Sequence, residues 1–295
     1  MSVQITDWMV QQYRANVTVL YQQEGSRLRG KVRERSVVGE TDFWDRIGPT
    51  DAVQKTVRHA PTPLISTPHS RRKITLLDFE WADLIDPVDK LKTIHTMESE
   101  YAQNGAKALG RSYDSEVIAA FTRDAFSGKT GSTTVTFASE AAGDLAFVAA
   151  AITTANMLAV KLKLDNKVVP FGTRYVAVVP HVLEQLLKQS TAPNAASFDY
   201  NSVKALINGD VNTWAGFEWT MMDPALMPVG TDATRKFNFA WHREAMGMSM
   251  AQEITTDIGI RRDLSNAMQV YLLHSFGGTR IMGEGVVRFE TDEDM

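Results

Sequence analysis

The last 29 residues of the chain, AMQVYLLHSFGGTRIMGEGVVRFETDEDM (267–295), constrain its fold more than any other segment. Val270, Leu272 and His274 alternate with Tyr271 and Leu273, and the β-type pattern resumes after Gly277 and Gly278 and runs to Phe289. At about 3.3 Å per residue, some twenty extended residues would span roughly 60 Å, far beyond an ordinary strand of five or six residues. We therefore predict one long, glycine-kinked strand path. Its length exceeds what a single compact domain accommodates, which favours an elongated domain or a larger assembly.

Charge is distributed unevenly along the chain. Eleven Lys or Arg and five Asp or Glu lie between Arg27 and Lys73, a local surplus of +6, although the whole chain carries −4. Residues 74–295 hold 19 basic and 28 acidic side chains. Three interpretations of the basic segment stay open: a solvated loop, a nucleic-acid-binding segment, and a segment that contacts the acidic body of a neighbouring copy. The second is less favoured because no aromatic-interleaved motif accompanies the charges.

Length and composition exclude several classes of protein. A chain of 295 residues with 44% hydrophobic content suits one large or two modest domains with a substantial core. The absence of cysteine excludes disulfides, thiolate zinc sites and cysteine nucleophiles. The N-terminus lacks the basic flank and apolar run of a signal peptide, and no stretch approaches 18 apolar residues. The sequence predicts a soluble, unexported protein with no membrane association.

The N-terminal third is predicted to be an arm followed by a long extended segment. Residues 5–23 place Trp8, Tyr13 and Tyr21 near helical spacing, which predicts an amphipathic N-terminal arm. From Gly25 to Arg72 no helical face is evident, and an irregular segment of this length commonly serves a function or binds another chain.

A strand and a long helix are predicted next. ITLLDFEWADLIDP alternates as a strand and ends at Asp86-Pro87, a helix N-cap followed by proline at the first helical position. The helical stripe that follows predicts a helix, or a broken pair of helices, of about forty residues that stops at Gly128.

The middle of the chain has α/β character. Residues 131–137 are predicted as a short strand, and a second amphipathic helix is predicted from Asp144 to Leu162. RYVAVVP (174–180) reads as a buried strand that runs into a proline-initiated helix. The alternating methionines 246, 248 and 250 predict a packing stripe on a β-strand.

The sequence offers little evidence for chemistry. GKTGST (128–133) lacks the phosphate-loop glycine, because Arg123 occupies that position. The six histidines have no metal-ligand spacing, and no nucleophile elbow or dinucleotide fingerprint occurs. The acidic run formed by Asp78, Glu80, Asp83 and Asp86 suits a divalent cation, but the exposed face of a strand and a helix cap explain it better. We expect no cofactor, no metal and no catalytic residue.

Three stretches together resemble a known family. RYVAVVPHVLEQLLKQ, NTWAGFEWTMMDPALMPVG and the closing KFNFAWHREAMGMSMAQEITTDIGIRRDLSNAMQVYLLHSFGGTRIMGEGVVRF are similar to the axial-domain strand and helix, the tryptophan-glycine strand and the final strands of tailed-bacteriophage major capsid proteins of the Hong Kong 97 type. In this chain Ala215 separates Trp214 from Gly216. The resemblance covers nearly the whole chain.

The resemblance implies an α+β capsid fold with named parts. An N-arm would occupy residues 1–25, and an extended hairpin called the E-loop residues 26–78. The peripheral domain would comprise 79–131 and 243–295, with a spine helix at about 87–127 and long closing strands. The α/β axial domain would comprise residues 132–242.

The resemblance also implies a function. The chain would self-assemble into hexamers and pentamers of an icosahedral head that encloses double-stranded DNA, packaged without sequence preference, with a separate scaffolding protein and a portal as partners. Two alternatives stay open, an encapsulin-like nanocompartment shell and an oligomeric metal-dependent enzyme. Lys55 is the candidate for a cross-linking lysine of the kind some family members carry. The expected inter-subunit contacts are made by Arg33, Arg35, Arg71, Arg72 and Lys73 in the E-loop and by Trp8, Tyr13 and Tyr21 in the N-arm.

Overall fold

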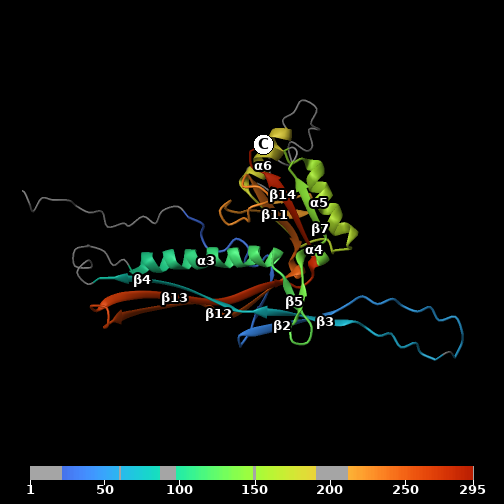
Figure 1. The fold of residues 1–295 in the computed structure, drawn as a ribbon, viewed down its shortest axis with the longest axis horizontal. Coiled ribbons are helices and arrows are strands. Elements are labelled where there is room, and N and C mark those ends of the chain that lie inside the picture. Colours follow the sequence, from blue (N-terminus) through green and yellow to red (C-terminus); the bar gives the residue numbers. More distant parts are fainter. Residues whose placement is uncertain (1–21, 60, 87–97, 149–150, 191–211, 295) are drawn as a thin grey trace, which may run out of the picture. The chain divides into compact units, whose positions relative to one another are not determined.

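The computed structural model describes residues 22–59, 61–86, 98–148, 151–190 and 212–294 of an α+β chain (Figure 1). Its elements in chain order are β1 (Arg33–Ser36), β2 (Thr41–Ile47), β3 (His69–Thr75), β4 (Leu77–Ile85), α3 (Glu98–Thr122), β5 (Ala125–Ser127), β6 (Thr133–Val135), α4 (Phe137–Glu140), β7 (Gly143–Phe147), α5 (Thr154–Asn166), β8 (Arg174–Val178), α6 (Pro180–Ser190), β9 (Thr213–Trp214), β10 (Phe217–Met221), β11 (Arg235–His242), η1 (Arg243–Ala245), β12 (Met246–Arg261), β13 (Ala267–Arg280), η2 (Gly283–Gly285) and β14 (Val286–Asp292). The predicted N-arm helix and the predicted helix start at Asp86-Pro87 involve residues 1–21 and 87–97, which lie outside the described residues.

The strands form three sheets, in the orders β1-β12-β13-β4, β7-β14-β11-β8-β10-β9 and β2-β3-β5-β6. By its internal contacts the chain divides into two compact units. The first contains residues 1–26, 78–112 and 252–275, and the second contains residues 27–77, 113–251 and 276–295.

The first unit has its own apolar core, formed where α3 packs against strands β4 and β13. Its buried members are Ile85, Leu109, Val270 and Leu272. Gly105 lies inside the helix because a Cβ at this position would stand 2.5 Å from the ring of Trp81. The helix therefore accepts a glycine, at a cost of roughly 1 kcal/mol relative to alanine, so that a large aromatic ring can approach its backbone.

The core of the second unit surrounds the six-stranded sheet. Every residue of β8 is buried, as expected for a strand covered on both faces. Helix α5 packs on β7 and β14 (Figure 1). The ring of Phe121 stacks on Phe239 and lies against Trp241, with centroids 4.7 and 4.9 Å apart. Aromatic contacts of this kind join the end of α3 to strand β11.

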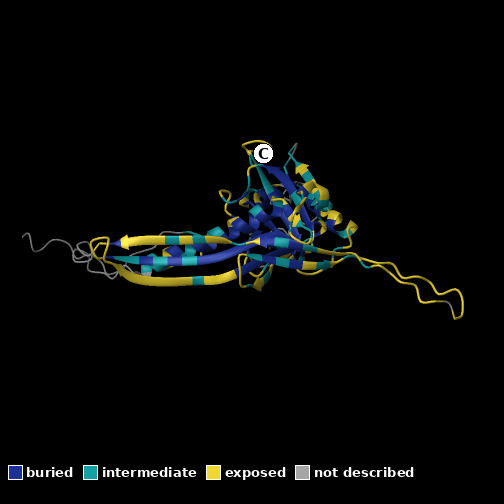
Figure 2. Cartoon of the chain, turned by 60° about the horizontal axis from the view of Figure 1, so that its bottom comes forward, coloured by how far each residue is buried: buried dark blue, intermediate teal, exposed yellow. Residues whose placement is uncertain are grey.

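Strands β2 and β3 form an antiparallel hairpin, in which Thr41 lies opposite Thr75 and Ile47 lies opposite His69. The loop that joins them, residues 48–68, is exposed along almost its whole described length (Figure 2). Hereafter it is called the hairpin loop.

Several sequence predictions are confirmed. The predicted strand RYVAVVP is β8, followed by α6, which begins at Pro180. Met246, Met248 and Met250 are buried along β12, as a packing stripe requires. Residues 128–132 of the segment GKTGST form a loop that leads into β6, and Gly128 and Gly131 adopt positive φ angles of 94° and 73°. Strand β6 lies within the predicted range 131–137.

The predicted helix from Asp144 to Leu162 is wrong in its first part. Gly143–Phe147 is strand β7, which pairs in parallel with β14, and α5 begins only at Thr154. Leu162, predicted on the buried face, is 56% exposed, whereas Val160 and Leu164 are buried. Pairing with β14, a strand some 140 residues away, determines the conformation of β7. The apolar spacing of residues 144–162 contains no information about this pairing.

The long helix also ends earlier than predicted. It stops at Thr122 rather than at Gly128, and Ala125–Ser127 forms β5, which pairs with β3. Arg280 explains the stop, because its Nη1 donates a 2.8 Å hydrogen bond to the carbonyl oxygen of Phe121 and a second bond to that of Arg123. A buried cation thus caps carbonyls that the helix leaves unpaired.

The prediction of a single closing strand path is wrong as well. β13 is a 14-residue strand, but it ends at Arg280, and the 3-10 turn η2 separates it from β14. β14 pairs with β11 and β7 in the six-stranded sheet. The chain therefore closes with two strands in two different sheets.

Candidate assembly surface at the base of the hairpin loop

Alternation along β2 and β3 sorts their side chains onto two faces. On one face Trp44 and Ile74 pack with Ile281 in a small apolar core. On the other face Arg71 lies over the ring of Phe43, with its guanidinium carbon 5.2 Å from the ring centroid. The period of two therefore places consecutive arginines of β3 in different environments.

A recess of about 690 Å³ opens beside the apolar core, and its walls include Arg33, Arg35, Trp44, Arg46 and Glu140. The guanidinium groups of Arg33 and Arg35 lie 4.9 and 4.6 Å from the centroid of the Trp44 ring. Such stacking holds two cations on one aromatic side chain and fixes their direction.

A chain of hydrogen bonds fixes the tryptophan itself. Nε1 of Trp44 donates to the hydroxyl of Ser249 at 3.0 Å, and this hydroxyl donates to Asp42 at 2.6 Å. The Asp42 carboxylate also accepts from two nitrogens of Arg35. Arg33 forms a separate ion pair with Glu244 at 3.1 Å. Both arginines are thus oriented within their own chain while about half of each side chain stays exposed.

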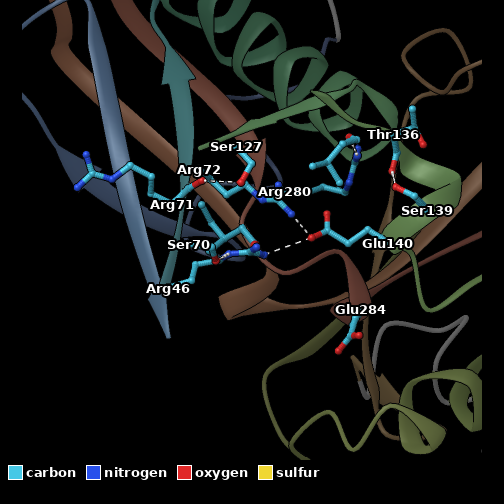
Figure 3. Close-up of polar contacts among 12 residues, drawn as sticks. Arg46, Ser70, Arg71, Arg72, Ser127, Thr136, Ser139, Glu140, Arg280 and Glu284 are labelled. Atoms are coloured by element: carbon cyan, nitrogen blue, oxygen red, sulfur yellow. Dashed lines mark hydrogen bonds and ion pairs between the residues drawn. The ribbon is translucent and has the colours of Figure 1, made fainter. Parts of the chain in front are cut away.

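In the wall of the recess, one carboxylate joins two arginines. Glu140, at the end of α4, accepts hydrogen bonds from Arg46 at 3.2 Å and from Arg72 (Figure 3). Nη1 of Arg46 also donates to the carbonyl of Ile281 at 2.6 Å. Gly283 makes room for the carboxylate, because a Cβ there would stand 2.6 Å from Cγ of Glu140. We call Arg46, Arg72 and Glu140 the ion-pair cluster.

Arg72 is therefore not a surface residue. Its side chain is 1% exposed, and desolvation by burial lowers its pKa, which the carboxylate of Glu140 partly offsets. The prediction that Arg72 contacts a neighbouring subunit is replaced by a role inside the chain, because the residue points toward Glu140 and not toward solvent.

The remaining predicted contact residues have mixed surroundings. Arg71 is 40% exposed and pairs with Asp45 at 3.0 Å. The stem of Lys73 lies over Gly131, where a Cβ would be 2.5 Å from Cδ of the lysine. Within the described residues, six of the eleven basic side chains of the segment 27–73 form ion pairs in their own chain: Lys31, Arg33, Arg35, Arg46, Arg71 and Arg72. Much of the basic surplus of this segment is therefore paired within the chain.

Other candidate residues lie elsewhere. Trp8, Tyr13 and Tyr21 lie outside the described residues. Asp78 and Glu80 are exposed on β4, and Glu80 accepts a 3.2 Å hydrogen bond from the hydroxyl of Tyr271. In the described part of the chain, no three His, Asp or Glu side chains come together as a metal site. None of the helices found there is long and apolar enough to cross a membrane.

Sequence reasoning missed Trp44, Arg46, Glu140 and Arg280. Their partners lie far away in the chain, 94 residues apart for Arg46 and Glu140, so local patterns carry no signal for them. Of these four residues, Arg280 was the one whose role the sequence could best have indicated. An arginine inside an apolar strand pattern must find carbonyl or carboxylate partners when it is buried.

Solved structures with the same fold include capsids of phages and of a GTA particle. The capsid structure of the cyanophage P-SCSP1u matches with a TM-score of 0.71 at 12% identity, over 97% of this chain and 94% of that one. A structure from the Mycobacterium phage Che8 matches with a TM-score of 0.66 at 16% identity, over 95% and 97%. A capsid of a native GTA particle matches with a TM-score of 0.65 at 11% identity, over 97% and 96%. The chain therefore has the Hong Kong 97-type capsid fold, as predicted.

The family follows from the sequence itself. The family model described as phage capsid protein matches residues 5–293. The chain belongs to the phage capsid protein family, and it is a structural component of the virion capsid and not an enzyme. A comparison with curated proteins gave no match.

Proposed function

We propose that this chain is the major capsid protein of a phage, which self-assembles into the hexamers and pentamers of an icosahedral head around double-stranded DNA. The family match over almost the whole chain and the fold shared with solved capsids support this proposal. A shell of many copies is held by repeated interfaces, and avidity supplies the stability that one contact lacks.

The hairpin loop is the observation that carries the proposal. Val53 and Val57 are 62% and 61% exposed, and Leu64 is fully exposed. Large apolar side chains exposed on one loop are suited to a surface that another chain covers. In a shell, the chain that covers the hairpin loop would be a neighbouring copy of the same protein.

The parts of the chain would have separate roles in assembly. Residues 1–25 would form the N-arm and residues 26–78 the E-loop with its hairpin loop. The peripheral domain would be built on 79–131 and on the closing segment from 243, and the axial domain on 132–242. We place β14 with the axial domain because it pairs with β11 and β7.

Contacts between copies would involve the exposed arginines at the hairpin base. Arg33, Arg35 and Arg71 keep 40–51% of their side chains exposed and are held in fixed directions, so they are suited to meet acidic groups of a neighbour. Lys73 completes this set. In the N-arm, Trp8, Tyr13 and Tyr21 would contact another copy, because such aromatic side chains are costly to leave in water.

Further partners follow from the family resemblance. We expect a separate scaffolding protein, a portal, and DNA held without sequence preference, since no base-reading motif occurs in the chain.

The experiment combines electron microscopy with light scattering on the purified protein. The wild type is expected to form shells of uniform diameter. A variant with Val53, Val57 and Leu64 changed to serine is expected to stay folded by circular dichroism and to remain as capsomers or monomers. The matched control changes the exposed loop residue Gln54 to serine. Normal shells from the triple variant would contradict the role of the loop, and a wild type that remains monomeric would contradict the capsid proposal.

The N-arm is tested separately by deleting residues 1–23. We expect a soluble, folded protein that assembles poorly. If the deletion unfolds the chain, the arm belongs to its own core and does not reach a neighbour.

A further inference from the structure

Helix α3 carries a polar stripe along one face. Its members follow one another at intervals of three, four and three residues, which places them on the same side of a helix. They are Asn104, Lys107, Arg111 and Asp114. Each of them contacts residues 22–28, the segment that joins the predicted N-arm to β1. Hereafter residues 22–26 are called the strap.

The strap is held to the stripe by one side-chain amide and one ion pair. Nε2 of Gln22 donates to Oδ1 of Asn104 at 2.9 Å, and Oε1 of Gln22 accepts from Nη1 of Arg111 at 2.7 Å. Nζ of Lys107 lies 3.3 Å from Oε1 of Glu24, whose side chain is 83% exposed. Both ends of the Gln22 amide are therefore engaged, which fixes the direction of the chain at this residue.

Two glycines let the strap cross α3 closely. A Cβ at Gly110 would stand 2.6 Å from the carbonyl carbon of Gly25, closer than side chains approach a backbone. Gly25 itself adopts φ 67°, in the left-handed region that favours glycine. Glycine inside a helix is unfavourable compared with alanine, so the close crossing, and not the helix, explains Gly110.

The residues that follow the strap are held differently. The buried carboxylate of Asp114 accepts hydrogen bonds from the backbone nitrogens of Arg27 at 2.9 Å and Leu28 at 3.1 Å. Leu28 and Val32 are themselves fully buried. Hydrogen bonds to a buried carboxylate are strong and little affected by salt, whereas exposed ion pairs are weak and screened. The strap can therefore move while the chain stays anchored at Arg27.

We propose that the strap is a positioning device for assembly, which aims the N-arm at its contact on a second copy of this chain. This inference rests on the proposed function, in which the N-arm contacts another copy. The direction of the chain at Gln22 is the starting direction of the residues before it. Fixing that direction in advance lowers the entropy that the arm loses on binding. Lys107 and Arg111 are positioning residues here, because they act through the strap.

The first test shows whether the strap is closed in solution. A water-soluble carbodiimide activates the carboxylate of Glu24, the amine of Lys107 attacks it to form an amide, and the carbodiimide leaves as its urea. This link adds no spacer, so it requires the contact that the structure shows. We expect mass spectrometry to find the linked peptides in protein of monomeric mass. The yield should fall severalfold in about 1 M salt, where the screening length is about 3 Å. No link at low salt would overturn the inference.

The second test reverses the ion pair. Glu24→Lys places a cation beside Lys107 at an exposed position, so the urea midpoint of the unassembled protein should not change. Shell formation, followed by light scattering, should slow severalfold because the repelled strap no longer directs the arm. Adding Lys107→Glu recreates the pair with opposite polarity and should restore the rate. Lys107→Arg keeps the charge and is the matched control, which should assemble like the wild type.

The third test closes the crossing. Gly110→Ala favours the helix but places a methyl group against the backbone of Gly25. The yield of the link between Glu24 and Lys107 and the rate of assembly should both fall, while circular dichroism shows an intact helix content. An unchanged yield would contradict the close crossing on which the strap depends.

The outcomes distinguish this inference from the proposed function. If the wild type forms shells and Glu24→Lys forms them at the same rate, the inference is overturned while the capsid function stands. If the single reversal slows assembly but the double reversal does not restore it, the charges act at another surface, and the inference is overturned as well. If the wild type forms no shells, the proposed function fails and the role of the strap in assembly fails with it, although the link still reports whether the strap is closed.

Discussion

Replacing Glu140 by glutamine should be among the most destabilising single changes in the second unit. The carboxylate is 15% exposed and joins Arg72, 1% exposed, to Arg46, 23% exposed. Glutamine keeps the shape but removes the negative charge, which leaves a buried guanidinium unpaired. Breaking a buried ion pair in this way costs about 3–5 kcal/mol.

The partial exposure of Glu140 and Arg46 places the expected loss at about 3 kcal/mol, the lower end of that range. With a urea dependence of about 3 kcal/mol per molar, the unfolding midpoint of the unassembled protein should fall by about 1 M. The assay is urea unfolding followed by circular dichroism. A matched control, Glu284→Gln, removes a carboxylate from the same recess that is 63% exposed and 3.7 Å from its lysine, and it should change stability by less than about 0.5 kcal/mol.

A double-mutant cycle then isolates the pair. In an Arg72→Met background, Glu140→Gln should cost only about 1 kcal/mol, so the coupling between the two residues is about 2 kcal/mol. Equal losses for the Glu140 and Glu284 variants, or additive effects in the double mutant, would refute the assignment of Glu140 as the centre of the ion-pair cluster.

Two further predictions concern the same unit. Gly283→Ala should cost about 1–3 kcal/mol in urea unfolding because its methyl group would meet Glu140, whereas Gly259→Ala, with open space around it, should be nearly neutral. Burial lowers the pKa of His242, whose ring accepts a backbone hydrogen bond from Glu244. The neutral ring therefore stabilises the fold fully above its unfolded pKa of about 6.5, and this contribution is lost as pH falls through the lowered value. Melting temperatures between pH 8 and pH 5 should fall less steeply for His242→Gln, and equal slopes would contradict this.

Much of the fold is readable from local patterns. The apolar run ending in Pro180 specified a buried strand and the helix after it, because a continuous apolar stretch and a proline at the first helical turn act on neighbouring residues alone. The alternating methionines of β12 were predicted for the same reason, whereas the extended hairpin was implied by the family resemblance. The family resemblance rested on such stretches, and it led to the correct fold.

The tertiary structure decided what depended on distant partners. The helical spacing from Asp144 did not prevent Gly143–Phe147 from pairing with β14, and Arg280 ended α3 through carbonyl oxygens more than 150 residues away in the chain. Arg71 and Arg72 have the same charge in the sequence, yet the pleat of β3 turns one to solvent and the other into the ion-pair cluster. A local pattern records periodicity and propensity, but burial and ion pairing are properties of the neighbours that folding brings together, and no local stretch contains them.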